Sequence, residues 1–395
     1  MKQQIQSWNQ ESLKEVLITL ESGGRPTGGA QKEGIPSIGG EHLNYNGRFN
    51  FETMKFIPED YFNSMNRGII NKEDVLIVKD GATTGKTSFV DNNFPYEKSA
   101  VNEHVFIARP NEKIFPKYLF YYLYSGDGQE QLKKCITGSA QGGINLSILD
   151  KILVVYPSSK DYQKQIVSAI ETHFSRLDNA IQNLKSVKNK IQLYRKAVLK
   201  KAFEKKGGWE EKKIGEITAT RKEKSNPKEY PQKSYIGMAH VESDNGKIIE
   251  EHFAKEMKAT SSNFYKGDVL YGRLRPYLNK VVDADFEGLC STEFIILMPK
   301  INYNFLGWRL RSLDFVNFAN SLNTGDRPRV KFDQIANFKI YFPKDEVGQL
   351  SIVSAIEAKF SIIDKVEDAV DKSLVKAERL RKSILKSAFE GRLVE

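Results

Sequence analysis

One segment of this chain occurs twice, without a gap, at a constant offset of 186 residues. Between residues 163 and 204, 18 of 42 positions are identical to their partners at that offset. The six residues at 166–171, Ile-Val-Ser-Ala-Ile-Glu, return unchanged at 352–357. Self-similarity at a fixed spacing is the signature of a duplicated structural unit. The chain is therefore predicted to be two tandem copies of one unit, and each copy ends in the same element.

That repeated element is predicted to be a long helix. Neither Pro nor Gly occurs within residues 161–206 or 349–390, and apolar residues recur there at spacings of three, four and seven, which is the pattern of one apolar helical face. The apolar stripes consist of Ile170, Phe174, Leu177, Ile181, Leu184, Ile191 and Val198, and of Ile356, Phe360, Ile363, Val370, Leu374, Ala377 and Ile384. A helix of about 40 residues is roughly 60 Å long, too long for a domain of ordinary size to cover. We therefore predict that the two helices pair as an intramolecular coiled coil, with two separate surface helices as the alternative.

Composition is that of a soluble protein with room for two cores besides the helices. Hydrophobic residues make up 40% of the chain and mean hydropathy is −0.48. No apolar run approaches a membrane span, and the opening residues 1–4 are polar without a signal core, so a cytoplasmic location and no membrane partner are expected. Two cysteines, Cys135 and Cys290, predict neither a disulfide framework nor a cysteine metal site.

The net charge of +10 is unevenly distributed. Residues 161–206 contain 11 Lys or Arg and four Asp or Glu, whereas residues 346–391 contain eight of each kind. A basic helix of this kind is either a solvated face or a surface that meets phosphate or an acidic partner. Charge alone leaves both interpretations open.

Outside the helices the two copies correspond loosely. Each begins with a Trp, Trp8 or Trp209, and continues with short β-branched and aromatic runs bounded by Gly, Asn and Asp, which are typical of strands. One helix is expected in each copy, near residues 116–124 and near residues 305–320. The predicted fold class is α+β, with two tandem mixed α/β domains separated by two long antiparallel helices in an intramolecular coiled coil with pseudo-twofold symmetry.

Loop residues differ between the copies where the apolar strand positions keep their type. Residues 80–86 of the first copy stand where the second has residues 273–280, and residues 139–145 stand where the second has residues 326–331. The loops are rich in Arg, Lys, Asn, Gln and Thr, which are the residue types that contact base edges and phosphates. The pattern favours two similar recognition tasks on different targets, and ordinary drift of surface loops is the alternative.

The sequence contains no recognisable catalytic motif. Residues 81–87 resemble a phosphate-binding loop, but only three residues separate the two glycines where that motif needs four, and a strand, not a helix, is expected to follow. No Pro-Pro dipeptide and no Pro-Asp dipeptide occurs, and the five histidines have no metal-ligand spacing. His42 and His240 occupy equivalent positions and are expected to be structural. The chain is predicted to bind and not to catalyse.

These features together resemble the specificity subunits of type I restriction–modification enzymes over essentially the whole chain. The resemblance rests on the Trp-initiated domain starts, the Thr-Gly loops before the apolar strands that end at Pro157 and Pro343, and the paired terminal helices. Within the helices it is carried by residues 163–167 and 195–203, and after them by residues 391–393. Residues 347–351 depart from the pattern, which leaves the start of the second helix open.

The resemblance implies a DNA-recognition subunit whose two target-recognition domains each recognise half of a bipartite site. The helices would set the spacing and dock two modification subunits. The implied boundaries are 1–160 for the first target-recognition domain, 161–206 for the central helix, 207–345 for the second domain and 346–395 for the C-terminal helix. The implied partners are double-stranded DNA, the modification subunits of an adenine methyltransferase and the restriction (translocase/nuclease) subunits. No cofactor is expected in this chain, since S-adenosylmethionine, ATP and Mg would belong to the partner subunits.

The candidate DNA contacts are polar or aromatic loop residues of both domains. They are Lys79, Thr83, Thr84, Lys86, Gln141 and Asn145 in the first domain, and Arg273, Arg275, Tyr277, Asn279, Arg327, Arg329 and Lys331 in the second. Of these, Arg273 and Arg275 are expected to pair with guanine through two hydrogen bonds. The alternatives to DNA recognition are a duplicated protein-binding scaffold with a coiled-coil spacer and a nucleotide hydrolase that uses residues 81–87.

Overall fold

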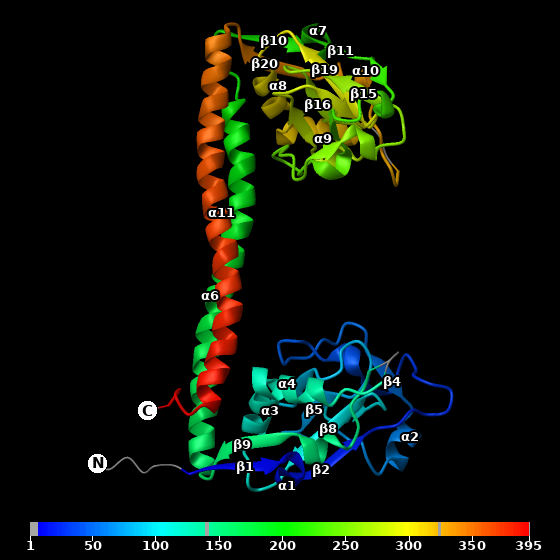
Figure 1. The fold of residues 1–395 in the computed structure, drawn as a ribbon, viewed down its shortest axis with the longest axis vertical. Coiled ribbons are helices and arrows are strands. Elements are labelled where there is room, and N and C mark those ends of the chain that lie inside the picture. The colour runs from blue at the N-terminus through cyan, green and yellow to red at the C-terminus, as the bar shows by residue number, and fades with distance from the viewer. Residues whose placement is uncertain (1–6, 139–141, 323–324, 395) are drawn as a thin grey trace, which may run out of the picture. The chain divides into compact units, whose positions relative to one another are not determined.

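The computed structural model describes residues 7–138, 142–322 and 325–394. By its internal contacts the chain divides into two compact units, one formed by residues up to 183 together with those from 373 onward, and the other by residues 184–372. We call them unit 1 and unit 2 and describe each by itself (Figure 1). Each unit contains one globular domain and a segment of both long helices. In the described part of the chain, no helix is both long enough and apolar enough to cross a membrane.

The globular domain of unit 1 is built around a four-stranded antiparallel sheet in the order β2-β8-β5-β6. A second sheet has three strands in the order β4-β3-β7, which alternate along the chain with those of the first sheet, and β1 pairs with β9 as a separate two-stranded ribbon. The strands are β1 (Trp8–Ser12), β2 (Leu17–Ser22), β3 (Ile35–Ile38), β4 (Lys55–Ile57), β5 (Val75–Val78), β6 (Thr87–Phe89), β7 (Ala100–Val101), β8 (Val105–Pro110) and β9 (Leu153–Pro157). The short helices are α1 (Leu13–Val16), η1 (Gly40–His42), α2 (Glu59–Ser64), α3 (Pro116–Tyr124), α4 (Gly126–Lys134) and α5 (Ile148–Lys151).

The globular domain of unit 2 repeats this plan. Its four-stranded sheet has the order β11-β19-β16-β17, and its second sheet has five strands in the order β12-β15-β18-β13-β14. The strands are β10 (Trp209–Lys213), β11 (Thr218–Thr220), β12 (Lys224–Ser225), β13 (Ser234–Ile236), β14 (His252–Phe253), β15 (Ser261–Phe264), β16 (Val269–Gly272), β17 (Val281–Asp283), β18 (Gly288–Cys290), β19 (Phe294–Pro299) and β20 (Lys339–Pro343). The short helices are α7 (Ile214–Ile217), η2 (Pro227–Glu229), η3 (Met238–His240), η4 (Ala254–Glu256), η5 (Pro276–Leu278), α8 (Tyr303–Leu310), α9 (Leu313–Ser321) and α10 (Phe332–Ile335).

Strand pairing shows that the two domains are copies of one fold. In unit 1, β3 pairs parallel with β7 and antiparallel with β4; in unit 2, β13 pairs parallel with β18 and antiparallel with β14. The ribbons β1-β9 and β10-β20 both begin on a Trp opposite a Pro. The predicted duplication and mixed α/β class are confirmed, and the additional strands of unit 2 belong to its second sheet.

The number of helices in each domain was predicted wrongly. The expected helix near residues 116–124 is α3, but a further helix, α4, follows it directly. The expected helix near residues 305–320 is broken into α8 and α9 at Arg311 and Ser312. The break has a local cause, because the Ser312 hydroxyl donates to the Arg309 carbonyl oxygen and accepts from the Arg309 guanidinium. A side chain bonded in this way competes with the helical hydrogen bonds of the backbone.

The two long helices are α6 (Lys160–Ala202) and α11 (Glu346–Phe389). Their first residues differ by the repeat offset of 186, so the second helix starts in register with the first despite its divergent sequence. In both cases a buried Gln fixes the start. Gln163 donates to the Pro157 carbonyl and accepts from the Phe115 N–H, while Gln349 donates to the Pro343 carbonyl and accepts from the Asn302 N–H, all at 2.7–2.8 Å.

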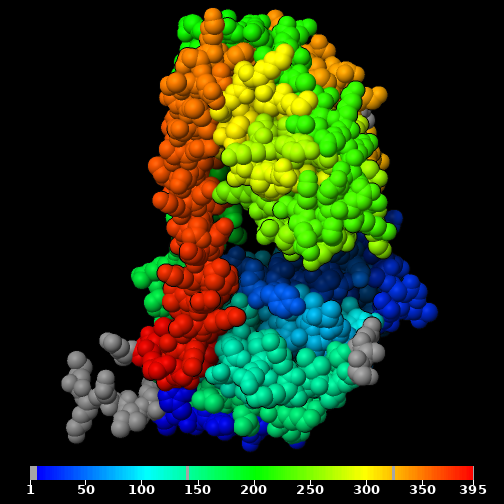
Figure 2. All heavy atoms as spheres, turned by 45° about the horizontal axis from the view of Figure 1, so that its top comes forward, coloured from blue at the N-terminus to red at the C-terminus, as the bar shows by residue number. Residues whose placement is uncertain are grey.

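Within each unit the apolar stripes of the two helices pack against each other and against the globular domain. In unit 1 the core includes Ile170 and Phe174 of α6 with Ile384 and Phe389 of α11. In unit 2, residues 191–203 of α6 share a core with residues 353–363 of α11. The early part of one helix therefore meets the late part of the other, which is the antiparallel pairing predicted from the sequence. Figure 2 shows the yellow segment that holds α8 packed against the orange part of α11.

Phe360 offers a direct test of this packing. The residue is 6% exposed, and its ring lies 4.7 Å from the Trp308 ring, centroid to centroid. Phe360→Ala is expected to lower the free energy of unfolding by about 3–5 kcal/mol through lost burial and a residual cavity. Ile362→Ala on the same helix is the control, because Ile362 is 63% exposed and its loss is expected to stay within about 0.5 kcal/mol. Urea unfolding of the full chain checks both, and equal losses would contradict the packing.

Candidate nucleic-acid interface

The two candidate loops of unit 1 come together in space. Asp80 and Gly143, 63 residues apart in the sequence, form an antiparallel β-bridge. The Ile144 N–H donates to the Lys79 carbonyl at 2.7 Å, and the Thr84 hydroxyl is 3.0 Å from the Gly142 carbonyl oxygen, to which it donates. The segment after β5 and the segment before α5 therefore form one continuous surface. Gln141 lies outside the described residues.

The two candidate loops of unit 2 are joined at the equivalent place. Leu274 and Arg329 form an antiparallel β-bridge. The Arg275 N–H donates to the Pro328 carbonyl at 2.8 Å, and the Val330 N–H donates to the Arg273 carbonyl at 3.1 Å. Both units thus bring together two loop segments whose residues differ between the copies, residues 79–86 with 142–145 in unit 1 and residues 273–280 with 326–331 in unit 2. We call the joined segments the recognition loops.

The candidate side chains of the unit 1 recognition loops are partly used by the fold. The Lys79 ammonium donates to the Glu103 carbonyl at 3.2 Å, and the Thr84 hydroxyl bonds backbone carbonyls of its own loops. Thr83 is half-buried, and Asn145 is exposed with its side-chain oxygen accepting from the Ser147 N–H. The role of each of them in DNA contact stays a prediction.

Lys86 has an aromatic partner that the sequence did not single out. Its ammonium nitrogen lies 4.3 Å from the centroid of the Tyr45 ring, and Tyr45 itself is 74% exposed. Burial lowers the pKa of Lys86. An exposed ring beside a cation is a surface on which a base or a sugar can pack. The only sequence signal was the polar turn Asn-Tyr-Asn-Gly at residues 44–47.

In unit 2 the candidate residues differ in solvent exposure and in the contacts that their side chains make within the fold. Tyr277, Arg327 and Lys331 are exposed. Arg329 is bound to Glu293, with 2.9 Å between the guanidinium nitrogen and the carboxylate oxygen. Within the described residues, the buried Nε atoms of Arg273 and Arg275 have no hydrogen-bond partner. The Nε atoms of Arg309 and Arg311 are unpaired in the same way, so DNA contact by Arg273 and Arg275 stays a prediction.

Asn279 is placed differently from the other candidates. It is 5% exposed, and its amide nitrogen donates to the Asp244 carboxylate at 2.9 Å and to the Arg311 carbonyl at 3.1 Å. Its backbone φ of +46° is in the left-handed region, where Asn is among the tolerated residues. Both amide hydrogens are already used by the fold, although DNA contact by this residue is untested.

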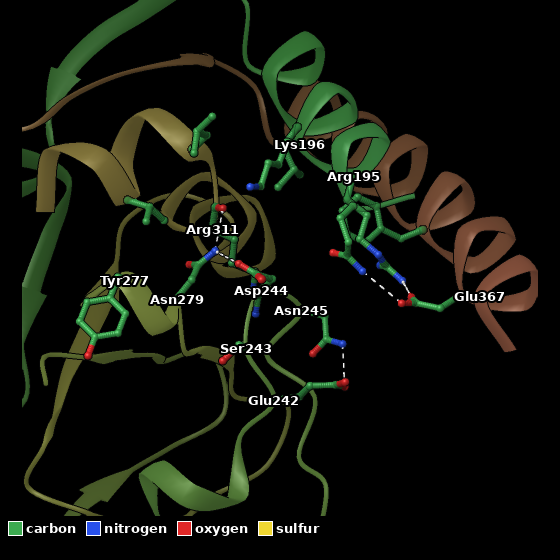
Figure 3. Close-up of a pocket in the computed structure, with 15 residues that line it drawn as sticks. Arg195, Lys196, Glu242, Ser243, Asp244, Asn245, Tyr277, Asn279, Arg311 and Glu367 are labelled. Atoms are coloured by element: carbon green, nitrogen blue, oxygen red, sulfur yellow. Dashed lines mark hydrogen bonds and ion pairs between the residues drawn. The ribbon is translucent and has the colours of Figure 1, made fainter. Parts of the chain in front are cut away.

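A cleft lies between the recognition loops and the long helices in each unit. In unit 2 it measures about 550 Å³ and is lined by Tyr277 and Asn279 on one side and by Arg195 and Lys196 on the other; Figure 3 shows these side chains. The cleft of unit 1 measures about 830 Å³ and is lined by Tyr45, Lys86, Arg381 and Lys382 among others. The helix residues 195–196 and 381–382 are the same Arg-Lys dipeptide at the repeat offset.

Residues 81–87 and the two histidines at equivalent positions have structural roles. Residues 81–87 run into strand β6 and not into a helix, so they lack the context of a phosphate-binding loop. The Nδ1 atoms of His42 and His240 accept from the Gly39 and Gly237 N–H groups at 2.8 and 3.0 Å. Among the described residues no three His, Cys, Asp or Glu side chains are grouped so as to hold a metal ion.

Fold and loops together define a duplicated recognition protein with two homologous domains. The chain belongs to the family of the type I restriction modification DNA specificity domain, which it matches over residues 6–192 and 206–370. The tandem domains accordingly recognise DNA sequence, and the family assignment does not support the protein-binding scaffold.

Individual relatives agree with this assignment. The chain is similar to the type I restriction enzyme EcoDI specificity subunit of Escherichia coli, with 28% identity over 188 residues, which cover 47% of this chain and 42% of that protein. It is also similar to the StySPI specificity subunit of Salmonella potsdam, with 22% identity over 398 residues, which cover 92% of this chain and 83% of that protein.

Two solved structures share the fold. One is a chain from a structure on complex assembly and conformational transition of the type I R-M system, with a TM-score of 0.77 and 16% identity over 99% of this chain and 100% of that one. The other is the HsdS subunit from Thermoanaerobacter tengcongensis, with a TM-score of 0.61 and 16% identity over 98% of this chain and 97% of that one. At such identity the likeness concerns the fold alone.

Proposed function

We propose that this chain is the DNA-specificity subunit of a type I restriction–modification complex, in which each globular domain recognises one half of a bipartite site. The observation that carries the proposal is the joining of two loops that differ between the copies, across a β-bridge at the same place in both domains. A fixed scaffold with a replaceable surface is what two recognition tasks on different sequences require. The long helices are proposed to set the distance between the half-sites, because half-site spacing follows from protein geometry.

The proposal extends to partners, cofactors and location. Two modification subunits are proposed to dock on the helices and to supply S-adenosylmethionine and the adenine methylation. Restriction subunits are proposed to supply ATP-driven translocation and Mg-dependent cleavage. The complex is proposed to act in the cytoplasm. The basic first helix and the related family members support this assembly, which a pull-down of modification subunits with the tagged full chain tests.

Within the recognition loops, the cations divide into two proposed roles. Arg273 and Arg275 are proposed to contact base edges, since a guanidinium group can donate two parallel hydrogen bonds to guanine. Arg327 and Lys331, which are exposed, are proposed to contact phosphates, which supply affinity and its salt dependence but no sequence information.

Arg275→Lys tests the base contact without removing charge. The variant is expected to lose about 1–3 kcal/mol of discrimination at one base position in the half-site of the second domain, because the Lys ammonium lacks the rigid planar fork that matches two acceptors. Binding of the complete complex to duplexes with single base changes, across a salt series, measures this effect. The salt dependence is expected to stay unchanged.

Two further variants make this experiment specific. Lys331→Gln is expected to reduce the slope of log affinity against log salt by about one, with the sequence preference kept. Lys266→Gln, at an exposed lysine outside the recognition loops, is expected to change neither quantity. An Arg275→Lys variant with unaltered discrimination at every position would remove Arg275 from the recognition surface.

A further inference from the structure

Both units contain the same ionic contact among three elements. A carboxylate on one long helix binds an arginine of the other long helix and a basic residue at the tip of a loop of the globular domain. In unit 1 these residues are Asp178, Arg381 and Arg48; in unit 2 they are Asp364, Arg195 and Lys247. We call each set of three residues a clasp.

In the unit 2 clasp, each carboxylate oxygen of Asp364 has its own cation. One oxygen is 2.6 Å from the Arg195 guanidinium, and the other is 2.5 Å from the Lys247 ammonium. Arg195 lies 5.1 Å from the centroid of the Phe360 ring, its side chain is 12% exposed, and it binds Glu367 at 2.8 Å. Figure 3 shows the bond between Arg195 and Glu367. The arginine is therefore held by packing as well as by charge.

In the unit 1 clasp, the same division occurs. One Asp178 oxygen is 3.0 Å from the Arg48 guanidinium, and the other binds Arg381. Arg381 lies 4.4 Å from the centroid of the Phe174 ring, which corresponds to the Phe360 ring of unit 2. Its side chain is 15% exposed. In both clasps the two oxygens of one carboxylate are thus divided between a helix arginine and a loop cation.

The helix residues of the clasps belong to the unchanged part of the repeat. The Phe, the Asp and the Arg all recur at the offset of 186, within the stretch in which 24 of 42 positions have changed. The loop residues, by contrast, lie in segments of different length. Arg48 is 130 residues from its Asp, whereas Lys247 is 117 residues from its Asp. The contact has therefore been kept while the chain that connects its parts has changed length.

The loop tip itself is also repeated. Asn46-Gly47-Arg48 and Asn245-Gly246-Lys247 have the same order of residue types. In both tips the Asn side-chain oxygen accepts from the backbone N–H of the basic residue, at 3.1 and 2.9 Å. Both glycines have a positive φ, +77° and +72°, and a side chain at Gly246 would collide with the Val281 carbonyl oxygen. The turn therefore fixes the backbone of the basic residue whose side chain contacts the helix carboxylate.

Electrostatics keeps the Asp364 clasp charged. Burial by itself would raise the pKa of Asp364, but the hydrogen bonds from Lys247 and Arg195 outweigh it and lower that pKa. Asp364 is thus a carboxylate at neutral pH. Lys247 is thus paired with Asp364, and Arg48 is paired with Asp178.

We propose that the clasps are positioning devices that fix the angle of each recognition domain on its helix pair and thereby narrow the range of half-site spacings that the protein accepts. This inference rests on the proposed function. In each unit the carboxylate lies on one long helix and is bonded to the other long helix and to the tip of the domain loop, so a change in domain angle must strain or break one of its bonds.

The test uses the complete complex with its modification subunits and a library of duplexes in which the gap between half-sites has the native length or is one base pair shorter or longer. Lys247→Ala is expected to lower the preference for the native gap by about two- to five-fold, the range given by a partly exposed ion pair. The half-site sequences are expected to stay unchanged. Lys247→Arg is expected to retain the native preference, since the equivalent position of unit 1 is Arg48.

A combined variant and a control sharpen the test. Arg48→Ala with Lys247→Ala is expected to lower the preference by about the product of the single effects, because distant sites add. Lys266→Ala, at an exposed lysine outside the clasps, is expected to have no effect. If the wild-type complex prefers one gap and Lys247→Ala keeps the same preference, or if Lys247→Arg behaves like Lys247→Ala, the clasp proposal is overturned. If the wild-type complex recognises no gapped site, the proposed function fails instead.

Discussion

Exchange of residues 209–345 for the corresponding segment of another family member is expected to change one half of the recognised DNA sequence and to leave the other half as it was. The reason is that both recognition loops of unit 2 lie inside this segment and are joined to each other, while those of unit 1 are joined through their own bridge. The two half-sites are therefore expected to be independent. Methylation mapping in a host that lacks other methyltransferases measures the full motif before and after the exchange.

The reciprocal exchange of residues 8–158 is the matched control. It is expected to alter the other half-site, and the two exchanged halves are expected to combine additively in a chain that carries both. The exchange leaves the helix residues in place, so the gap length is expected to stay the same. A single exchange that altered both half-sites would show that the two domains do not recognise DNA separately.

Lengthening both helices is expected to widen the gap between the half-sites. Seven residues inserted between Asn183 and Leu184 of α6, with seven more between Lys372 and Ser373 of α11, fall where the two units divide, so the contacts within each unit are kept. Seven helical residues add about 10.5 Å, which corresponds to roughly three base pairs at 3.4 Å each. Half-site sequences are expected to be unaffected.

Methylation mapping checks this prediction as well. Insertion into α6 alone is the control, because it shifts one apolar stripe against the other and is expected to impair the protein as a whole. If the doubly lengthened chain is active and its gap is unaltered, the helices do not set the spacing.

The parts of the fold that could be predicted from the sequence are those with long periodic or repeated signals. The ungapped repeat predicted the duplication, and the sustained apolar stripes predicted α6, α11 and their pairing. The single helix expected near residues 305–320 was wrong, because the break depends on bonds of one side chain, Ser312, which no periodicity shows. The start of α11 was left open by its divergent sequence, and the structure fixes it through Gln349.

The candidate site was predictable in part. Divergence between the copies singled out two loop segments in each domain, and the structure joins them, whereas their contact with DNA stays a prediction. Their joining could not be predicted, because Asp80 and Gly143 meet only through the folded sheet. The burial of individual side chains could not be predicted either. Asn279 is of a residue type that contacts base edges, yet its amide donates to the Asp244 carboxylate and to the Arg311 carbonyl. The clasps could not be predicted from the sequence, because each joins residues more than a hundred positions apart.

The most direct test of the account is to map methylated positions in the DNA of a methylation-free host that expresses this chain with its modification subunits. The account predicts one motif made of two specific half-sites, separated by a gap of fixed length in which any base is accepted. A continuous motif without a gap, or a gap of variable length, would contradict the central claim that two separate domains recognise DNA at a distance set by the helices.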